Sequence, residues 1–543
     1  MNSDSEDDTF DVPNEEQDDG WDNVSDVVFL EDGNENVANN TSDDDSENEV
    51  ITQRRKKARN DNEAQETITF KLRREDLVPI LHDFNDVNSG CQIENLDPNP
   101  SALDIFESFI TENIVEEILN QTNMFYNLFI QNNPDKALKN HKPPTMDEIY
   151  VFLAISLLMP LVKKNGIKDY WSKDIIIEIP IFGQIMSRDR YLFFLRYLHF
   201  ADNSNPNKDD RLYKIRCIVD HFKSVFKRSF YPFQNIVIDE SLLLFKGRLS
   251  FRQYIPSKRH RFGVKFFVMV DCETGYILDF IIYTGGTTEI KEIKKSVGKS
   301  GNIVLSLTKP YWNKGHHLYT DNWYTSPLLY EFLFHKEINC CGTVKANRQF
   351  MPPFQKTKGK GTVHMLTSMH TSAMQMTEIS SNKEVEKPTC VIDYNLNMGG
   401  VDRTDMLLST TESVRKTIKW YKKVFFHLLD LAILNSHAVC KMKTGENIPL
   451  LEFQKILRKT LIEKYRKVKP RPSGTRPYDG HSPLRLIERH FPSTYPPKPE
   501  TNKKILKQCI VCAKQGKRKS TTFTCKNCDV ALCFERYHTV LKF

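Results

Sequence analysis

The sequence predicts a multidomain protein whose central α/β unit lies between helical segments and is followed by a small cysteine-rich tail. Apolar residues recur at helical spacing from about residue 102 to 233. At residue 235 the pattern changes to short β-branched runs that are typical of strands. Five of the 12 cysteines fall between residues 509 and 533. A chain of 543 residues has room for about two to four such units.

The composition excludes several classes of protein. Hydrophobic residues make up 39% of the chain and charged residues 27%, as in ordinary globular proteins. The longest near-continuous apolar stretch, residues 150–162, is shorter than the ~20 residues of a membrane helix. The first residues lack the basic and apolar regions of a signal peptide. We therefore expect a soluble, intracellular protein with no membrane partner.

Charge is distributed very unevenly along the chain. Of the 70 acidic residues, 19 lie in residues 1–50, which contain none of the 76 basic residues. The rest of the chain therefore carries a formal net charge of +25. A body this basic indicates a polyanionic partner such as nucleic acid, because Lys and Arg that neutralise phosphates release bound counterions. A merely soluble basic surface is the alternative.

The N-terminal segment, residues 1–65, is rich in Asp, Glu, Asn and Ser. Such a segment buries too little apolar surface to offset its ordering entropy, so we expect it to be disordered. Within it lies a basic cluster at residues 54–59, of the kind that nuclear import receptors read. The cluster predicts a location in the nucleus, with a solvated charge run as the alternative.

Helical signals dominate residues from about 102 to 233 and return beyond residue 411. In the first segment, Thr145 and Glu148 have the spacing of a capping box, which predicts a helix start just before an apolar run. The aromatic residues 190–200 predict a buried helix. In the second segment, apolar residues on one side predict a long helix that begins near residue 419.

Strand signals dominate the region between them. Residues 235–239 form a β-branched run, and residues 263–271 and 276–283 flank a turn that predicts a β-hairpin. A further strand is expected at residues 317–321, followed by a helix at residues 326–334. The central unit is therefore predicted to be α/β.

Three aspartates mark the ends of these predicted elements. Asp239 closes one strand, Asp321 closes another, and Asp402 follows paired glycines at a predicted helix start. Carboxylates that meet at a sheet edge can hold two Mg²⁺ ions for phosphoryl transfer. Spacing alone does not establish this, because aspartates also cap helices and end strands for structural reasons.

The residues around these aspartates resemble the piggyBac transposase family. The resemblance extends from about residue 100 to 538, and several separate motifs occur in the family's order. The motifs are IDES (238–241), FKGR (245–248), YIP (254–256), KRHRFGVK (258–265), TDNWYTS (320–326), DYNLNMGGVD (393–402), YLHFADN (197–203) and RKTIKW (415–420).

The resemblance implies a DDE/D transposase that cuts and pastes DNA at TTAA sites. Asp239, Asp321 and Asp402 match the family's metal ligands, which hold two Mg²⁺ ions, and Asp405 matches a further acidic catalytic position. Water activated by metal nicks the element end, and the released 3′-OH then attacks the opposite strand to form a hairpin. The implied partners are double-stranded DNA, as element ends and TTAA target, and a second copy of the chain in a homodimer.

The resemblance also implies a domain order. An α/β RNase H-like catalytic core is expected at residues 235–345 and 389–410, interrupted by a β-rich insertion at residues 346–388. The helical segments 96–234 and 411–469 would form one composite DNA-binding and dimerisation domain. The insertion is shorter than is usual in the family. A proline-rich stretch, residues 470–504, is expected to be an extended linker.

A basic stretch near the first catalytic aspartate is predicted to contact DNA phosphates, which would fix position rather than sequence. Its alternative is a solvated surface. The residues are Lys246, Arg248, Lys258, Arg259, Arg261 and Lys265.

The tail at residues 505–543 predicts a zinc module. Two CxxC pairs can complete one tetrahedral site, and an intracellular protein is unlikely to use them as disulfides. The predicted ligands are Cys509, Cys512, Cys525, Cys528, Cys533 and His538. The family's module is cross-braced around two Zn²⁺ ions and needs eight ligands, whereas this motif supplies six. One Zn²⁺ is therefore predicted, and the second remains open.

Two alternatives to an active transposase remain. A domesticated, catalytically inactive protein would bind specific DNA without cutting it. A protein-interaction module is the other, since cross-braced zinc domains also read histone tails.

Overall fold

The computed structural model describes residues 78–136, 142–203, 206–207, 209–255, 261–353, 362–379, 383–411, 413, 417, 419–467, 492–497, 504–525 and 530–533. Contacts divide the chain into two units, Met1–Arg466 and Lys467–Phe543, and each is described by itself.

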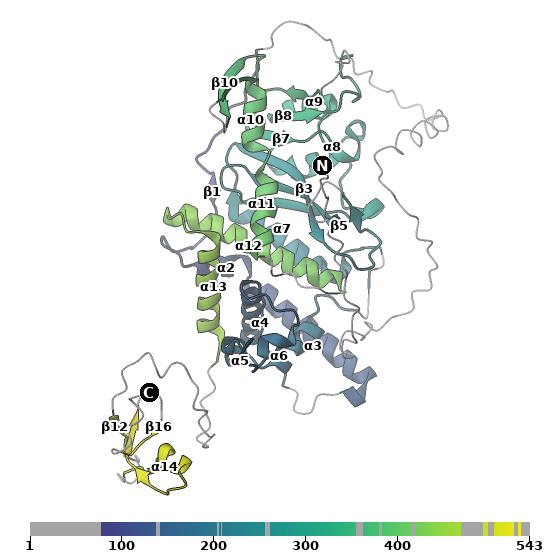
Figure 1. Ribbon diagram of the computed structural model, residues 1–543. Helices are drawn as coiled ribbons and strands as arrows, with labels where there is room; N and C mark the ends of the chain where they lie inside the picture. The colour runs from purple at the N-terminus through teal and green to yellow at the C-terminus, as the bar shows by residue number, and fades with distance from the viewer. Residues whose placement is uncertain are drawn as a thin grey trace, which may run out of the picture. The chain divides into compact units, whose positions relative to one another are not determined.

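A mixed sheet forms the centre of the first unit (Figure 1). Its strands β5, β3, β7, β8 and β9 are neighbours in that order, while β4 and β6 both pair with β5. β5 and β6 are joined to β3 as an antiparallel meander, and β7 and β8 run parallel to β3. This sheet, with helices packed on it, agrees with the predicted α/β core. The bounds are β3 Asn235–Leu244, β4 Gln253–Tyr254, β5 Phe262–Asp271, β6 Ile277–Ile282, β7 His317–Thr320, β8 Asn339–Val344 and β9 His364–Thr367.

The strands agree with the predicted runs to within a few residues, with two differences. β3 continues to Leu244, well past the predicted end at Asp239, because its second half keeps pairing with β5. β9, which lies in the predicted insertion, pairs antiparallel with β8 and so belongs to the central sheet. Beyond β9, the predicted insertion contains one described hairpin, β10 Met374–Ile379 with β11 Lys383–Pro388.

Helices flank the sheet. α10 Thr389–Asn397 and α11 Gly400–Thr411 pack on β3, and α9 Pro327–Phe334 packs on β8. α8 Gly298–Thr308, which the sequence did not predict, packs on β6. α9 begins where expected, with the Ser326 hydroxyl accepting from the main-chain N–H of Leu329.

The remaining helices of the first unit come from two distant parts of the sequence. They are α2 Ala102–Phe109, α3 Glu112–Asn132, α4 Met146–Leu158, α5 Pro180–Ile185, α6 Arg188–Tyr197, α7 Arg216–Ser229, α12 Trp420–Thr444 and α13 Leu450–Tyr465, with a short pair of strands, β1 Gly90–Cys91 and β2 Phe230–Tyr231. α13 packs on α4 and α2, where the rings of Tyr150 and Tyr465 stack at 4.0 Å and Tyr465 donates to Glu107. The two helical segments therefore lie side by side.

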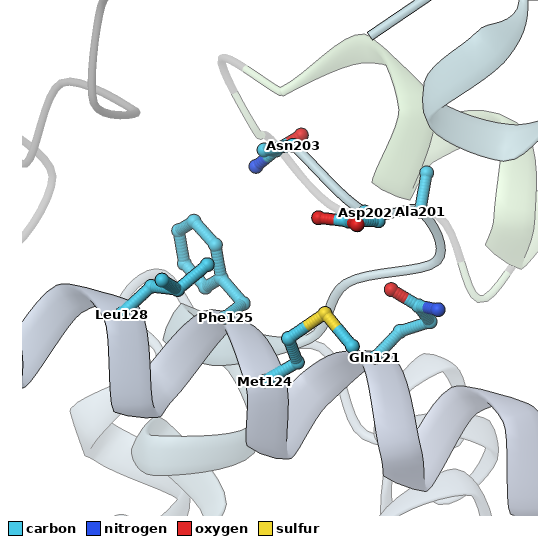
Figure 2. A pocket seen from close by; sticks show the side chains of 7 residues that line it. All are labelled: Gln121, Met124, Phe125, Leu128, Ala201, Asp202 and Asn203. Atoms are coloured by element: carbon cyan, nitrogen blue, oxygen red, sulfur yellow. The ribbon is translucent and has the colours of Figure 1, made fainter. Parts of the chain in front are cut away.

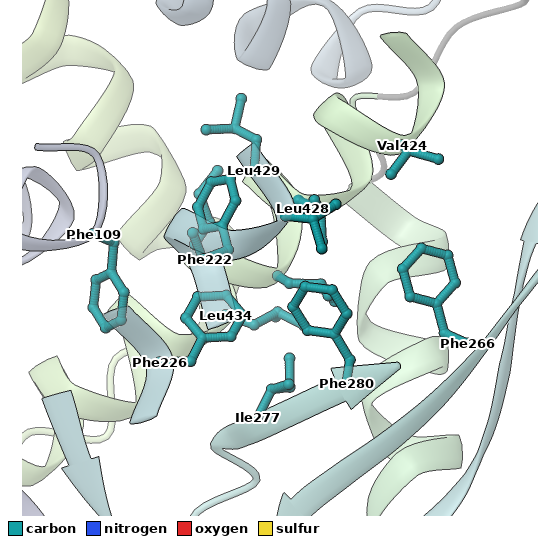
Figure 3. Packing of buried hydrophobic residues seen from close by; sticks show 14 of the residues in the cluster. Phe109, Phe222, Phe226, Phe266, Ile277, Phe280, Val424, Leu428, Leu429 and Leu434 are labelled. Carbon is teal, nitrogen blue, oxygen red and sulfur yellow. The ribbon is translucent and has the colours of Figure 1, made fainter. Parts of the chain in front are cut away.

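Local signals explain how individual helices begin and why they are buried. Thr145 and Glu148 form the predicted capping box of α4. The aromatic side chains of α6 are buried, as expected for a core helix. Under the sheet, α7 and α12 pack Phe222, Phe226 and Leu428 against Ile277 and Phe280 of β6 (Figure 3).

α12 is long and apolar enough to cross a membrane by length and composition alone. However, 94% of its most apolar window is buried inside the protein. Asn435 helps to hold α12 in position. Its side-chain amide accepts a hydrogen bond from the main-chain N–H of Ile277 and donates one to the carbonyl of the same residue. α12 is therefore a core helix of the first unit.

The second unit is small. It contains β12 Pro492–Thr494, β13 Lys507–Gln508, α14 Ile510–Lys514, β14 Ser520–Thr521, β15 Phe523–Cys525 and β16 Val530–Ala531. β12 lies within the stretch predicted to be a linker, yet it pairs with β15 of the tail. Residues 470–491 and 498–503 of that stretch lie outside the described residues.

Candidate active site

The sheet brings Asp239 and Asp321 to neighbouring positions. β3 and β7 are parallel, and their last paired residues are Ile238 and Thr320. Each aspartate is the next residue on its strand, so the two lie at the same level, about one strand spacing of ~4.8 Å apart in the backbone. Both side chains are half-buried.

Asp321 is held by a tight turn that follows β7. Its carboxylate accepts from the main-chain N–H of Trp323 at 3.0 Å, and the Thr325 hydroxyl donates to its carbonyl at 2.8 Å. Burial and the neighbouring charge of Glu240 raise the pKa of Asp321. The main-chain N–H groups of Trp323 and Tyr324, and the charge of Lys265, oppose this shift. A carboxylate in this setting gains most from a nearby cation, because a cation favours its charged form.

α11 supplies the other two acidic residues. Side chains at alternate positions of a strand share a face, so Val237, Asp239 and Ser241 all face α11. A Cβ added at Gly400 would come within 2.7 Å of Val237 Cγ1, and the Ser241 hydroxyl donates to Asp405 Oδ1 at 2.6 Å. The helix therefore lies against the strand on both sides of Asp239.

Asp402 occupies the first turn of α11, and its side chain is exposed. It lies three residues before Asp405, so the two share one side of the helix. The start of the helix also favours a negative charge there. The structure thus places all four predicted acidic residues where β3, β7 and α11 meet.

The donor set suits a hard divalent cation, because every candidate ligand is a carboxylate oxygen. Among the described residues, only the cysteines of the tail form a group of three metal-binding atoms within 4.8 Å of one another. The carboxylates are spread more widely than that.

The opposite face of the same sheet edge carries a second polar cluster. Lys265 Nζ lies 3.8 Å from Glu240 Oε2 and 4.8 Å from the ring centroid of Trp323, which in turn stacks on Phe267. Only 13% of the Lys265 side chain is exposed. The DNA contact of Lys265 stays a prediction; in this structure an aromatic ring and a carboxylate already lie beside its ammonium group.

The other predicted DNA-contacting residues divide into two sets. Lys246, Arg248 and Arg261 are exposed beside the end of β3, as a phosphate contact requires. Lys258 and Arg259 lie outside the described residues. Arg252, which the sequence analysis did not single out, is also exposed there, and its guanidinium donates to the carbonyl of Lys246 at 2.9 Å.

Residues 197–203, one of the motifs noted above, border a small hollow beside α3 (Figure 2). Its volume is about 10 Å³, roughly that of one water. His199 stacks on Phe125 at 4.1 Å, and its Nε2 lies 2.8 Å from Asn203 Nδ2. The motif therefore joins α6 to α3 rather than forming a ligand site. The lining residues are Gln121, Met124, Phe125, Leu128, Ala201, Asp202 and Asn203.

Three of the predicted zinc ligands converge in the second unit. The sulfur atoms of Cys509, Cys512 and Cys533 lie within 4.8 Å of one another, and Cys512 and Cys533 are 3.7 Å apart. That distance matches the edge of a tetrahedron with Zn–S bonds of ~2.3 Å. Burial opposes ionisation of Cys509, but hydrogen bonds from the main chain of Cys512 and Cys533 outweigh it and lower the pKa of its thiol.

The side chains of the other three predicted zinc ligands lie outside what the structure describes. Cys525 ends β15, and the position of its side chain is not described. Cys528 and His538 lie outside the described residues. The three described cysteines fit a zinc site that lacks one ligand, so a fourth would have to come from those positions.

The chain resembles known proteins along most of its length. The family model described as transposase IS4 matches residues 101–360 and 354–437, a range that contains all four aspartates. The chain is 25% identical over 485 residues to human PiggyBac transposable element-derived protein 3, covering 80% of this chain and 76% of that protein. It is 22% identical over 397 residues to human PiggyBac transposable element-derived protein 5, covering 66% and 75%.

A solved structure agrees with the fold. The cryo-EM structure of a piggyBac transposase synaptic complex with hairpin DNA superposes with a TM-score of 0.61. The two chains are 24% identical, and the match covers 80% of this chain and 96% of that one. This likeness supports the mixed α/β core.

Proposed function

We propose that this chain cleaves and rejoins DNA at its four acidic residues. The premise is that the chain belongs to the transposase IS4 family, as a piggyBac-like transposase or transposase-derived protein. The observation that carries the proposal is the side-by-side placement of Asp239 and Asp321, with the start of α11 packed on the same strand. Separate elements supply these carboxylates, and together they could hold the ions of a shared metal site.

Asp239, Asp321 and Asp402 would hold two Mg²⁺ ions, and Asp405 would orient the helix through Ser241. Such ions would activate an attacking oxygen and stabilise the leaving oxygen of a phosphodiester. The protein's part is to fix the carboxylates and to position DNA in line for displacement at phosphorus. One site could then serve nicking, hairpin formation and strand joining, because each is the same displacement.

The exposed basic residues Lys246, Arg248 and Arg261 would bind DNA phosphates next to this site. Their contacts would position the duplex without reading its sequence. We propose the TTAA target, the homodimer and the composite DNA-binding role of the helical segments from the family resemblance. The structural neighbour is a synaptic complex with hairpin DNA, which supports a DNA partner. A location in the nucleus is proposed from the basic cluster at residues 54–59.

The second unit would be a zinc module that helps recognise element-end DNA. The convergence of Cys509, Cys512 and Cys533 supports one Zn²⁺. Its described residues 504–525 contain six Lys or Arg and no Asp or Glu, which suits a phosphate-rich partner.

The test uses the purified full-length protein with Mg²⁺ and a duplex that joins a TTAA site to the terminal repeat flanking its gene. We expect a nick at the repeat end, followed by a hairpin, and loss of both in Asp239→Asn. Asp189→Asn is the matched control. It makes the same chemical change in α6, far from the site, at a carboxylate that is 83% exposed. A wild-type protein that nicks no DNA, or an Asp239→Asn variant that still nicks, would contradict the proposal.

The second candidate is a domesticated protein that binds DNA without cutting it. The small insertion favours it, since its described part adds only one hairpin beyond the central sheet. This candidate predicts binding to the same duplex with no nick in Mg²⁺ or Mn²⁺, and affinity that Asp402→Asn leaves unchanged.

A further inference from the structure

The row of groups at the sheet edge does not stop at Asp321. β7 and β8 are parallel, and their last paired residues are Thr320 and Gly342. The next residue on β8 is Thr343, so it lies beside Asp321 just as Asp321 lies beside Asp239. Three neighbouring strands therefore present two carboxylates and one hydroxyl at the same level.

A phenol extends this row. Tyr394 of α10 reaches β8, where its hydroxyl lies 3.5 Å from Thr343 Oγ1. Burial chiefly, and the charges of Asp321 and Asp239, raise the pKa of Tyr394 to about 12, although Thr343 opposes the shift. The phenol therefore keeps its proton at neutral pH, and its contact with Thr343 places it next to the strand position beside Asp321.

The position of Tyr394 is fixed by the residue before it. The Asp393 carboxylate accepts from the Tyr319 hydroxyl at 2.8 Å and from Asn397 Nδ2 at 3.0 Å, and it pairs with His370 Nε2 at 3.1 Å. Tyr319 belongs to β7, two residues before Asp321. α10 is thus tied to β7, which Asp321 follows, and to the segment between β9 and β10.

The hydroxyl of Tyr394 is only weakly engaged. Its contact with Thr343 is at the outer limit of a hydrogen bond, so little is lost when the proton turns to another acceptor. Both side chains are half-buried, so neither is fully enclosed in the core. A tyrosine that served only packing would not need a second hydroxyl beside it.

We propose that Tyr394 is a further substrate-contacting residue, whose phenol donates a hydrogen bond to a non-bridging oxygen of the scissile phosphate. Thr343 orients the phenol from β8, and Asp393 fixes α10 so that the phenol points along the carboxylate row. The inference rests on the proposed function, because it takes a phosphodiester beside Asp321 as the ligand. The hydrogen bond joins a neutral donor to a charged acceptor, the stronger kind of such bonds.

The first measurement is the single-turnover nicking rate of the full-length protein on the duplex described above. Tyr394→Phe removes only the hydroxyl, and we expect the rate to fall about tenfold or more, which is the usual effect of a lost hydrogen bond to a charged group. Thr343→Val should lower the rate by a smaller factor. Tyr276→Phe is the matched control: this buried tyrosine loses a hydrogen bond to the carbonyl of Phe226 far from the site, and nicking should be unchanged.

The second measurement is binding without added Mg²⁺ to two duplexes, one with the natural scissile phosphate and one with a neutral methylphosphonate there. Wild type and Tyr276→Phe should prefer the natural duplex, and Tyr394→Phe should lose several-fold of that preference. If Tyr394→Phe nicked DNA at the wild-type rate and kept the wild-type preference for the natural duplex, the inference would be overturned. If the wild-type protein nicks nothing, the proposed function fails, yet the binding preference still decides whether Tyr394 contacts that phosphate.

Discussion

The central α/β unit and the cysteine-rich tail both concentrate metal-binding side chains, but they do so in opposite ways. In the tail, Cys509 and Cys512 are separated by two residues, and one short turn brings them together. In the core, Asp239 and Asp321 are far apart in the chain and meet only because β3 and β7 pair in one register. In the tail, local spacing thus pairs Cys509 with Cys512, and the fold adds only Cys533, 21 residues after Cys512. In the core, the whole site is a property of the folded sheet.

The difference has an energetic consequence. The tail has a small cluster of buried residues, three of which are the cysteines themselves. The core has an extensive apolar interior that does not depend on any ion. We therefore expect metal to determine folding in the tail and chemistry in the core.

The largest expected effect is the loss of zinc. Structural zinc contributes about 10–16 kcal/mol to small modules of this kind, so Cys512→Ser should unfold the tail. The first unit should keep its own thermal transition within a few degrees. Calorimetry, together with zinc content and limited proteolysis of residues 467–543, measures this. Cys440→Ser, in buried α12 of the first unit, is the control, and zinc content should not change. If Cys512→Ser lowered the core transition equally, the two units would not be independent.

Next in size is the effect of Asp321→Asn on DNA cleavage. Removing one metal ligand costs several kcal/mol of transition-state stabilisation, which corresponds to about a thousandfold or more in rate. Folding should not suffer, because burial already makes the charged form of this residue unfavourable. Nicking rates and thermal unfolding without metal are the measurements. A variant that cleaves normally, or one that unfolds much more easily, would show that the carboxylate is structural.

A smaller effect concerns pH and the core helix α12. Burial, with a minor contribution from Lys423, lowers the pKa of His427 from 6.5 to about 4. The folded state therefore favours the neutral ring, and this contribution is present above pH 6.5 and is lost as the pH falls towards 4. It amounts to about 3 kcal/mol at most.

His427→Gln should therefore make the stability of the first unit less sensitive to pH between 6.5 and 4. Denaturant unfolding at several pH values measures it, with His335→Gln as the control, since that side chain caps the end of α9 and is exposed. An identical pH profile for wild type and His427→Gln would contradict the expectation.

The smallest effect tests how the core assembles its site. Gly400→Ala would place a Cβ 2.7 Å from Val237 Cγ1, whereas a Cβ at Gly399 meets nothing within 4 Å. We expect Gly400→Ala to cost about 1–3 kcal/mol of stability, as overpacking does, and to slow nicking by moving α11 away from Asp239. Gly399→Ala should do neither. Equal behaviour of the two variants would mean that the close approach of α11 is not needed.

Much of the fold was predictable because its signals are local. Strands β3, β5, β6 and β7 follow β-branched runs, and α4 starts at its capping box. α8 was missed, since its sequence begins with glycine, lysine and serine and has no strong apolar period. β9 was placed in the insertion, because only its pairing with β8 shows that it belongs to the sheet.

The candidate site was predictable in part. The aspartates stand out at the ends of strands and beside paired glycines, and the surrounding motifs identify the family. The environment of Lys265 was not predictable, because a lysine in a basic stretch gives no sign that Glu240 and Trp323 enclose it. Thr343 and Tyr394 were not singled out either, since a lone threonine and a lone tyrosine carry no spacing signal.

The sequence by itself determined the helical and strand segments, the acidic residues, the zinc-binding spacing and the uneven charge, because each of these depends on neighbours within a few residues. Only the tertiary structure decided which residues stand beside Asp321. Register is a long-range property: one set of main-chain hydrogen bonds aligns β3, β7 and β8, and a shift of one residue would turn every side chain of a strand to the other face. That alignment creates the carboxylate row, and no local pattern encodes it.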